Sequence, residues 1–250
     1  MSEQVLVSSA DGVCEIRLNR PEKRNAITLA MYEALCAALA GAQADSAVRA
    51  VLMSGEGAGF TAGNDLNDFL SGLKFDGDNP IMRLLGALAT FGKPLLAAVH
   101  GKTVGIGTTM LLHCDLIVAA RSTVFSMPFV SLGLVPEAAS SLLLPRLVGQ
   151  QRAAELLLLS KPFDAATAQS MGLVNRVVDE ADLLSEARKL ARDVVAQPVE
   201  ALLAARRLLR GDPAEVLARL DAEAKVFQER LQSAEFRAAV FAIASRGRAG

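Results

Sequence analysis

The spacing of hydrophobic and polar residues predicts a strand and a helix near the start of the chain. Along Val13–Leu18, apolar residues alternate with charged ones, so one side of the extended chain is hydrophobic. This period of two is typical of a half-buried strand. After a charged loop at 19–25, apolar residues recur at helical spacing to about Ala44, and Thr28 has the hydroxyl that commonly caps a helix. We therefore expect a strand, a loop and then a helix with an apolar stripe.

Strands and helices continue to alternate as far as about Gln197. The further expected strands are Val48–Met53, Leu95–Val99, Asp115–Ala119, Thr123–Ser126 and Val174–Val178. The further expected helices are Ile81–Phe91, Val104–His113, Pro136–Val148 and Gln150–Leu159, with a short helix after Asn64 and a mobile loop at Ser71–Pro80. Interleaved strands and helices favour an α/β fold.

The last part of the sequence is helical. From Ala181 onward the helical pattern is interrupted only at Pro198 and at Gly211–Pro213. We therefore expect a core over residues 1–197 and a helical region over residues 198–250. Phe227–Ile243 is apolar enough to need a covering surface. The helical region is thus either a second layer on the core or an oligomerisation element.

Composition excludes several classes of function. The net charge of −1 gives no support for binding nucleic acid or an anionic membrane, although a local basic pocket for a phosphorylated small molecule is compatible with it. No apolar run is long enough to span a membrane. The first residues lack the features of a signal peptide, and the last are not a peroxisomal signal, so we expect a cytoplasmic protein.

Cysteine and histidine are too few and too scattered to suggest a metal site. The three cysteines are far apart and lie in apolar segments, which is typical of reduced thiols in a cytosolic protein. With only two histidines and no paired cysteines, a zinc site is not expected.

Two glycine-rich segments differ from the loops that bind nucleotides. A Walker A loop ending at Gly101–Thr103 needs a glycine where Leu96 stands, and a dinucleotide motif beginning at Gly105 lacks its third glycine, at Met110. Instead, a turn here leads from a strand into a helix, whose first N–H groups have no internal partner. The segment Phe60–Leu66 repeats this arrangement. Both are either ordinary turns or a pair of donors able to stabilise an oxyanion.

Glu137 is the acid that gives these turns a possible use. It follows Pro136, just inside the predicted start of an apolar helix. Proline followed by glutamate is also a favoured helix start for structural reasons alone. A helix start lowers the pKa of a carboxyl group and an apolar pocket raises it, and the sequence leaves both effects open.

At these residues the chain resembles the crotonase (enoyl-CoA hydratase/isomerase) superfamily. The resemblance covers most of the chain and depends on several motifs together. They are Asn19-Arg20-Pro21 with Asn25-Ala26, Phe60–Leu66, Gly101–Gly107, Cys114-Asp115 and Gly172-Leu173-Val174.

The resemblance implies a fold and a set of site residues. The fold is a ClpP-like spiral of ββα units, followed by C-terminal helices that form homotrimers, often stacked as hexamers. The substrate is a CoA thioester whose carbonyl oxygen is held by two backbone N–H groups, at Ala62 and Ile106 in this sequence. The residues implied for CoA binding are Arg24 with its neighbours Arg20 and Lys23, Ala26, Asp65 and Leu66. No cofactor and no metal is implied, because coenzyme A is part of the substrate.

Two departures from the family pattern favour one reaction over another. Hydratases of the family have glutamates at the positions of Thr109 and Phe129, and neither residue here can replace an acid. The segment Met127–Gly133 followed by Pro136 and Glu137 resembles the Δ3,Δ2-enoyl-CoA isomerase branch, in which the acid at the Glu137 position is the catalytic base.

The resemblance therefore implies an isomerase of fatty-acid β-oxidation. Glu137 would remove a proton from C2 of a 3-enoyl-CoA and return one to C4, giving trans-2-enoyl-CoA. Three alternatives stay open: a hydratase that uses Glu137 with water, another thioester reaction of the superfamily, and a non-catalytic CoA-binding or trimeric scaffold protein.

Overall fold

The main sheet of the protein has six strands, and the strands of its centre are parallel. The computed structural model describes residues 3–66, 68 and 79–247, so the predicted loop at Ser71–Pro80 and the predicted helix after Asn64 fall largely outside it. The strand order is β1-β2-β3-β4-β6-β9, with only β1 and β2 antiparallel. The strands are β1 (Val5–Ala10), β2 (Val13–Leu18), β3 (Ala50–Gly55), β4 (Leu95–Val99), β6 (Leu116–Ala120) and β9 (Arg176–Val178).

Helices cover both faces of this sheet, which explains its almost continuous hydrophobic strands. In β3, Val51 and Met53 point into the larger core beneath α1 (Leu29–Ala44) and α3 (Pro80–Thr90). The alternate residue Leu52 points into a smaller core beneath α8 (Leu183–Val195). Because successive side chains of a strand point to opposite faces, one apolar strand contributes to both cores.

A second, three-stranded sheet lies beside the first and carries the short helices of the site. Its order is β5-β7-β8. Its strands are β5 (Lys102–Val104), β7 (Val124–Ser126) and β8 (Phe163–Asp164). Around it lie the short helices α4 (Ile106–Thr109), η2 (Met110–His113), η3 (Val130–Leu132), α5 (Ser140–Val148), α6 (Gln150–Leu159) and α7 (Ala165–Ser170). Two further short helical turns are η1 (Pro21–Lys23) and η4 (Glu180–Asp182).

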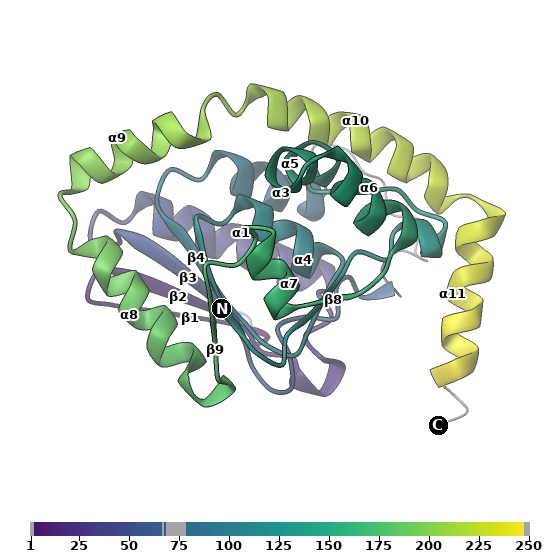
Figure 1. Cartoon of the computed structure of the whole chain (residues 1–250), viewed down its shortest axis with the longest axis horizontal. Coiled ribbons are helices and arrows are strands. Elements are labelled where there is room, and N and C mark those ends of the chain that lie inside the picture. Colours follow the sequence, from purple (N-terminus) through teal and green to yellow (C-terminus); the bar gives the residue numbers. More distant parts are fainter. Residues whose placement is uncertain (1–2, 67, 69–78, 248–250) are drawn as a thin grey trace.

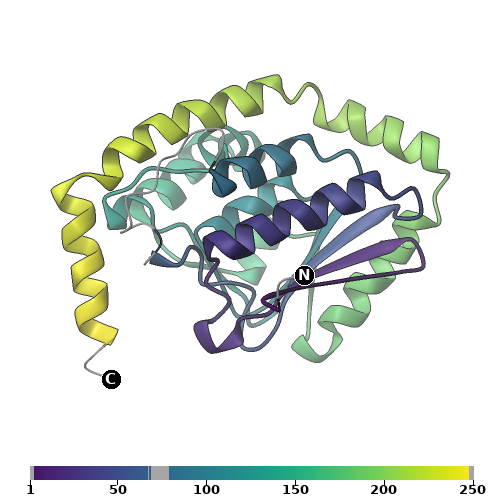
Figure 2. The ribbon, with the colours of Figure 1, turned by 180° about the vertical axis from the view of Figure 1, so that it is seen from behind.

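The last helices follow one another around the outside of the molecule (Figures 1 and 2). They are α9 (Val199–Arg210), α10 (Ala214–Leu231) and α11 (Ala234–Gly247), and α10 lies over α3 and α5. The predicted breaks at Pro198 and Gly211–Pro213 are confirmed, and a further break separates α10 from α11. Arg206 and Arg210 of α9 both bind the Asp115 carboxylate, at 2.7 and 2.9 Å, which attaches this helix to the core.

Three elements of the structure differ from the predictions. Strand β1 was not expected from its sequence, and four of its six residues are exposed, so it lacks an apolar alternation. Val104, expected to start a helix, ends β5, because Gly105 turns the chain with a φ of 56° before α4 begins. The helix expected at Pro136 begins only at Ser140. None of the helices within the described residues has the length and apolar character needed to cross a membrane.

Candidate active site

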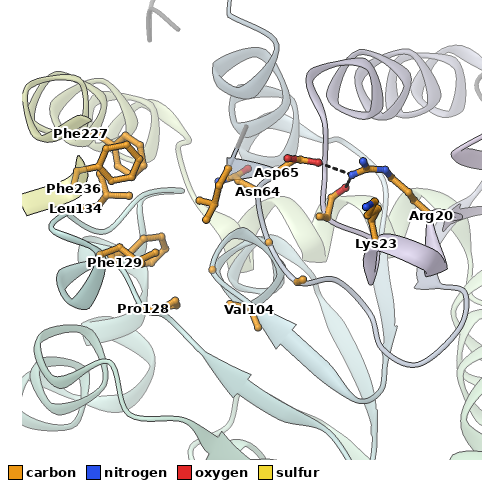
Figure 3. A pocket seen from close by; sticks show the side chains of 16 residues that line it. Arg20, Lys23, Asn64, Asp65, Val104, Pro128, Phe129, Leu134, Phe227 and Phe236 are labelled. Atoms are coloured by element: carbon orange, nitrogen blue, oxygen red, sulfur yellow. Dashed lines mark hydrogen bonds and ion pairs between the residues drawn. The ribbon is translucent and has the colours of Figure 1, made fainter. Parts of the chain in front are cut away.

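A cavity of about 540 Å³ lies where the two sheets, η3 and the last helices meet. Its two ends differ in chemistry (Figure 3): Arg20 and Lys23 lie at one end, while Phe129, Phe227 and Phe236 lie at the other. Asn64 lies between the two ends. A long ligand with one anionic end and one apolar end fits this polarity.

At the polar end, an ion pair orders the wall of the cavity. The Arg20 guanidinium donates to the Asp65 carboxylate at 2.7 Å and to the Ala26 carbonyl at 3.0 Å. Of the residues predicted to bind CoA, Ala26, Asp65 and Leu66 line the cavity. Arg24 does not: it is an exposed residue of the left-handed region, with a φ of 54°. Its neighbours Arg20 and Lys23 supply the positive charge instead.

Arg24 acts through its backbone, and this affects the predicted oxyanion donors. Its carbonyl accepts a hydrogen bond from the Ala62 N–H at 2.9 Å, so the donor predicted at Ala62 is already in use. Within the described part of the chain, the N–H groups of Asn64 and Ile106 have no acceptor. Asn64 lines the cavity, and Ile106 begins α4 directly after Gly105, which also lines it. The prediction at Ile106 is compatible with this arrangement. The Ala62 N–H is already bonded, and the unpaired N–H in the same turn is that of Asn64.

The two turns that carry these donors are bonded to each other. Thr61 and Thr103 form a parallel bridge, and the Val104 N–H donates to the Thr61 carbonyl at 3.0 Å. Gly63 has a φ of 91°, and a Cβ atom there would lie 2.9 Å from the Val104 carbonyl oxygen. Only glycine permits this close approach of the two turns.

Glu137 lies in a turn before α5 and not inside that helix. The two following residues, Ala138 and Ala139, are fully buried and both left-handed, with φ of 59° and 55°. Such a conformation costs about 1–2 kcal/mol for each residue that has a Cβ atom. This pair of residues delays the helix to Ser140, so that Glu137 is held apart from the helix start.

The Glu137 carboxyl group is buried, and one hydrogen bond offsets only part of the cost of burying its charge. It is 7% exposed, and the Thr109 hydroxyl donates to its Oε1 at 2.5 Å. The pKa of Glu137 is raised to about 8: burial is the largest cause, the Thr109 hydrogen bond lowers the pKa in part, and the nearby Glu223 charge adds to the increase. Of the two opposing effects that the sequence left open, the helix start and the apolar pocket, burial in the pocket therefore determines the pKa of Glu137. A carboxyl group whose pKa lies near neutral pH can both take up and release a proton.

Glu137 lies next to the large cavity but does not line it. It lines a second cavity of about 10 Å³, whose walls include Asn64 and Phe227, and both of these residues also line the large cavity. The Tyr32 hydroxyl donates to the Asn64 side-chain oxygen at 2.5 Å and holds this shared wall in place. Asn64 and Phe227 thus form a wall that the large cavity and the cavity at Glu137 have in common.

Comparison with known proteins identifies the family. A model of the family described as Enoyl-CoA hydratase/isomerase matches residues 8–248. The chain belongs to this family. It is therefore a crotonase-superfamily protein, as its motifs predicted, with an α/β fold and chemistry on CoA thioesters.

Three relatives illustrate the range of the enoyl-CoA hydratase/isomerase family. The chain is 34% identical to the 1,2-epoxyphenylacetyl-CoA isomerase of Escherichia coli (strain K12), over 98% of this chain and 97% of that protein. It is 35% identical to enoyl-CoA delta isomerase 2 of Rattus norvegicus, over 86% of this chain and 56% of the rat protein. The crystal structure of an enoyl-CoA hydratase/isomerase from Pseudoalteromonas atlantica T6c superimposes with a TM-score of 0.93, at 41% identity and 97% coverage of each chain.

The two hydratase positions of the family have other uses here. Thr109 is fully buried and donates to Glu137, and Phe129 lines the apolar end of the cavity. The sequence analysis did not identify Tyr32, Phe227, Phe236 and Glu223 as site residues. Phe227 and Glu223 share one face of α10, but nothing in the sequence of that helix indicates which part of the core it covers.

Proposed function

We propose that this chain isomerises 3-enoyl-CoA thioesters to trans-2-enoyl-CoA. The observation that carries the proposal is the setting of Glu137: a buried carboxyl group with a pKa of about 8, beside two turns with unpaired N–H groups. Two relatives are named as isomerases, of 1,2-epoxyphenylacetyl-CoA and of enoyl-CoA. The proposed context is fatty-acid β-oxidation.

In the proposed reaction, Glu137 carries one proton between two carbons. The carboxylate removes a proton from C2, and the electrons of that C–H bond form a dienolate whose charge collects on the thioester oxygen. The N–H groups of Asn64 and Ile106 stabilise this oxygen, each by about 3–4 kcal/mol. Glu137 then protonates C4, the double bond moves to C2–C3, and no atom is gained or lost. The reaction requires no metal and no redox cofactor.

The polarity of the cavity suggests how the substrate is oriented. Arg20 and Lys23 lie at the polar end and would contact the phosphates or adenine of CoA. Phe129, Phe227 and Phe236 at the other end would surround the acyl chain. Asn64 lies between them, where the thioester joins the two parts of the substrate.

We also propose that the chain forms homotrimers, or hexamers made of two trimers, through its last helices. Leu208 and Leu209 of α9 are 85% and 88% exposed, and Phe241 of α11 is 76% exposed. Burying such side chains stabilises an interface by roughly 1.5–3 kcal/mol each. Sedimentation analysis should give a mass of three or six chains, and Leu208→Glu with Leu209→Glu should reduce it.

Replacing Glu137 tests the proposed reaction. Glu137→Gln should lower kcat for 3-enoyl-CoA by about 10³-fold or more, because the amide cannot carry the proton. The measurement is the gain of absorbance of the conjugated thioester. Glu229→Gln, on the exposed face of α10, is the matched control and should keep wild-type activity. Wild-type turnover in Glu137→Gln would rule out this mechanism.

The same assay distinguishes isomerisation from hydration. With trans-2-enoyl-CoA as substrate, a hydratase consumes the conjugated double bond and the absorbance falls. We expect no such loss, because Thr109 and Phe129 provide no second acid. A panel of 3-enoyl- and 2-enoyl-CoA substrates of several lengths would also define the preferred acyl chain.

A further inference from the structure

The strained turn that carries Glu137 is held from two sides. On one side, His113 Nε2 lies 2.8 Å from the Ala138 carbonyl oxygen, which can only accept, so Nε2 carries the hydrogen. Burial lowers the pKa of His113 to about 4, which keeps this ring neutral at neutral pH. On the other side, the Glu223 carboxylate of α10 accepts hydrogen bonds from the Ala139 N–H at 2.7 Å and the Ser141 N–H at 2.9 Å.

Glu223 is bonded too completely to be a second proton carrier. The Ser141 hydroxyl donates to the same oxygen as the Ser141 N–H, at 2.5 Å, so both carboxylate oxygens have donors. Arg219 in turn donates to the Ser141 hydroxyl at 3.2 Å. Three donors hold this carboxylate in one position. Burial is the largest influence on the pKa of Glu223 and raises it above its ordinary value, while the hydrogen bonds from Ser141 and Ala139 favour the charged form.

Glu223 also lies close to the base. It lines the same 10 Å³ cavity as Glu137, and its charge is among the causes of the raised pKa of Glu137. The other groups that face Glu137 are the Thr109 hydroxyl of α4, which donates to it, and the Tyr32 hydroxyl of α1, whose pKa burial and Glu137 together raise. Among the described residues, Glu223 is thus the charged group that bears on Glu137.

We propose that Glu223 is a positioning residue which, together with His113, holds residues 137–139 in the strained turn that aims Glu137 at the substrate. This inference rests on the proton shuttle proposed for Glu137. It assigns a role in catalysis to the C-terminal helix α10, which is 84 positions from the turn that it holds. The charge of Glu223 has a second effect: it raises the pH at which Glu137 ionises.

Glu223→Gln tests both effects. The amide cannot accept from both N–H groups, so the turn should relax and kcat should fall by about 10²-fold, with KM changed by about twofold or less. Loss of the negative charge should move the acid limb of the kcat/KM profile to lower pH, because the Glu223 charge is among the causes that raise the pKa of Glu137. Glu223→Asp keeps the charge, so it should lower kcat and leave the acid limb in place.

Two further variants separate positioning from general loss of structure. His113→Gln should lower kcat without moving the acid limb, because His113 is neutral. This variant tests the proposal even if Glu223→Gln does not fold. Glu229→Gln should match the wild type in kcat and in pH profile. Folded fractions are measured by circular dichroism and thermal unfolding for every variant.

The outcomes distinguish this inference from the proposed function. If Glu137→Gln is inactive while Glu223→Gln and His113→Gln keep wild-type kcat and acid limb, the positioning role is wrong and the shuttle stands. The positioning role is also wrong if kcat of these two variants falls only in proportion to their folded fraction and the acid limb stays at the wild-type pH. If Glu137→Gln is fully active, the proposed function itself fails.

Discussion

Helix α1 is capped by a residue of its own segment, whereas helix α5 is capped by a residue 84 positions away. The Thr28 side chain accepts a hydrogen bond from the Met31 N–H at 3.2 Å, and α1 begins at Leu29 as its sequence predicts. At α5 the corresponding donors, the Ala139 and Ser141 N–H groups, bind the Glu223 carboxylate of α10.

The difference between the two helix starts follows their roles. Thr28, the residue that caps α1, has ordinary extended backbone (φ −87°, ψ 164°) and carries no proposed chemistry. The turn before α5 contains two left-handed alanines and the proposed base. A strained segment persists only where surrounding groups hold it, and here these groups come from η2 and α10. Function at this site therefore depends on contacts between distant parts of the chain.

The largest expected effect at the α5 start is a strong pH dependence of activity. If Glu137 must be ionised to take the first proton, its pKa of about 8 leaves only a small active fraction at low pH. Between pH 6 and pH 8, kcat/KM should rise about 50-fold, with a slope near one on a logarithmic scale. A profile measured with 3-enoyl-CoA that is flat over this range would show that the ionisation of Glu137 does not control the rate.

A second effect at the α5 start concerns stability. The folded state keeps Glu137 protonated up to a pKa of about 8, against an ordinary value of 4.5, so Glu137 makes the protein less stable as pH rises from 4.5 to 8. Between pH 6 and pH 8 this loss is about 2 kcal/mol in the free energy of unfolding. Glu137→Gln removes it, so the stability of this variant should fall less over that range.

Above pH 6.5, the ionisation of His113 does not change the difference in stability between the wild type and Glu137→Gln. Its pKa is lowered from 6.5 to about 4 in the folded state, so its contribution to stability is lost as pH falls from 6.5 towards 4. Urea unfolding of the wild type and of Glu137→Gln at pH 6.5, 7.25 and 8 measures the Glu137 effect. Parallel pH curves for the two proteins would contradict the assigned pKa.

The smallest expected effect is at α1. Thr28→Ala removes one side-chain cap and should lower the free energy of unfolding by about 1 kcal/mol. The acid limb of kcat/KM should stay at the wild-type pH, because Thr28 neither contacts Glu137 nor holds its turn. Thermal or urea unfolding checks the first expectation and a pH–rate profile the second. A shifted acid limb would mean that the two helix starts are coupled.

Much of the fold was readable from local patterns. The alternation in Val13–Leu18, the cap at Thr28 and the breaks at Pro198 and Gly211–Pro213 all correspond to observed element boundaries. Each depends on a residue and its near neighbours. The two glycine-rich turns were also recognised, because their glycines permit backbone conformations and contacts that side chains forbid.

The candidate site was only partly readable. Glu137 and Ile106 came from the family motifs, but the donor named at Ala62 is bonded to the Arg24 carbonyl, a contact between separate loops. Neither Ala138 nor Ala139 has a sequence signal for left-handed backbone, so the helix was expected four residues too early. Tertiary contacts overrule the helical preference of alanine at this turn.

The sequence by itself thus determined the family, most of the strands and helices, and the candidate acid with its two glycine-rich turns, because these depend on periodicity, capping and short motifs. Tertiary structure alone decided which N–H groups are unpaired, how far Glu137 is buried, and that Glu223 and His113 hold its turn. The physical reason is range: capping and periodicity act within a few residues, whereas burial, pKa and backbone strain depend on groups that only folding brings together.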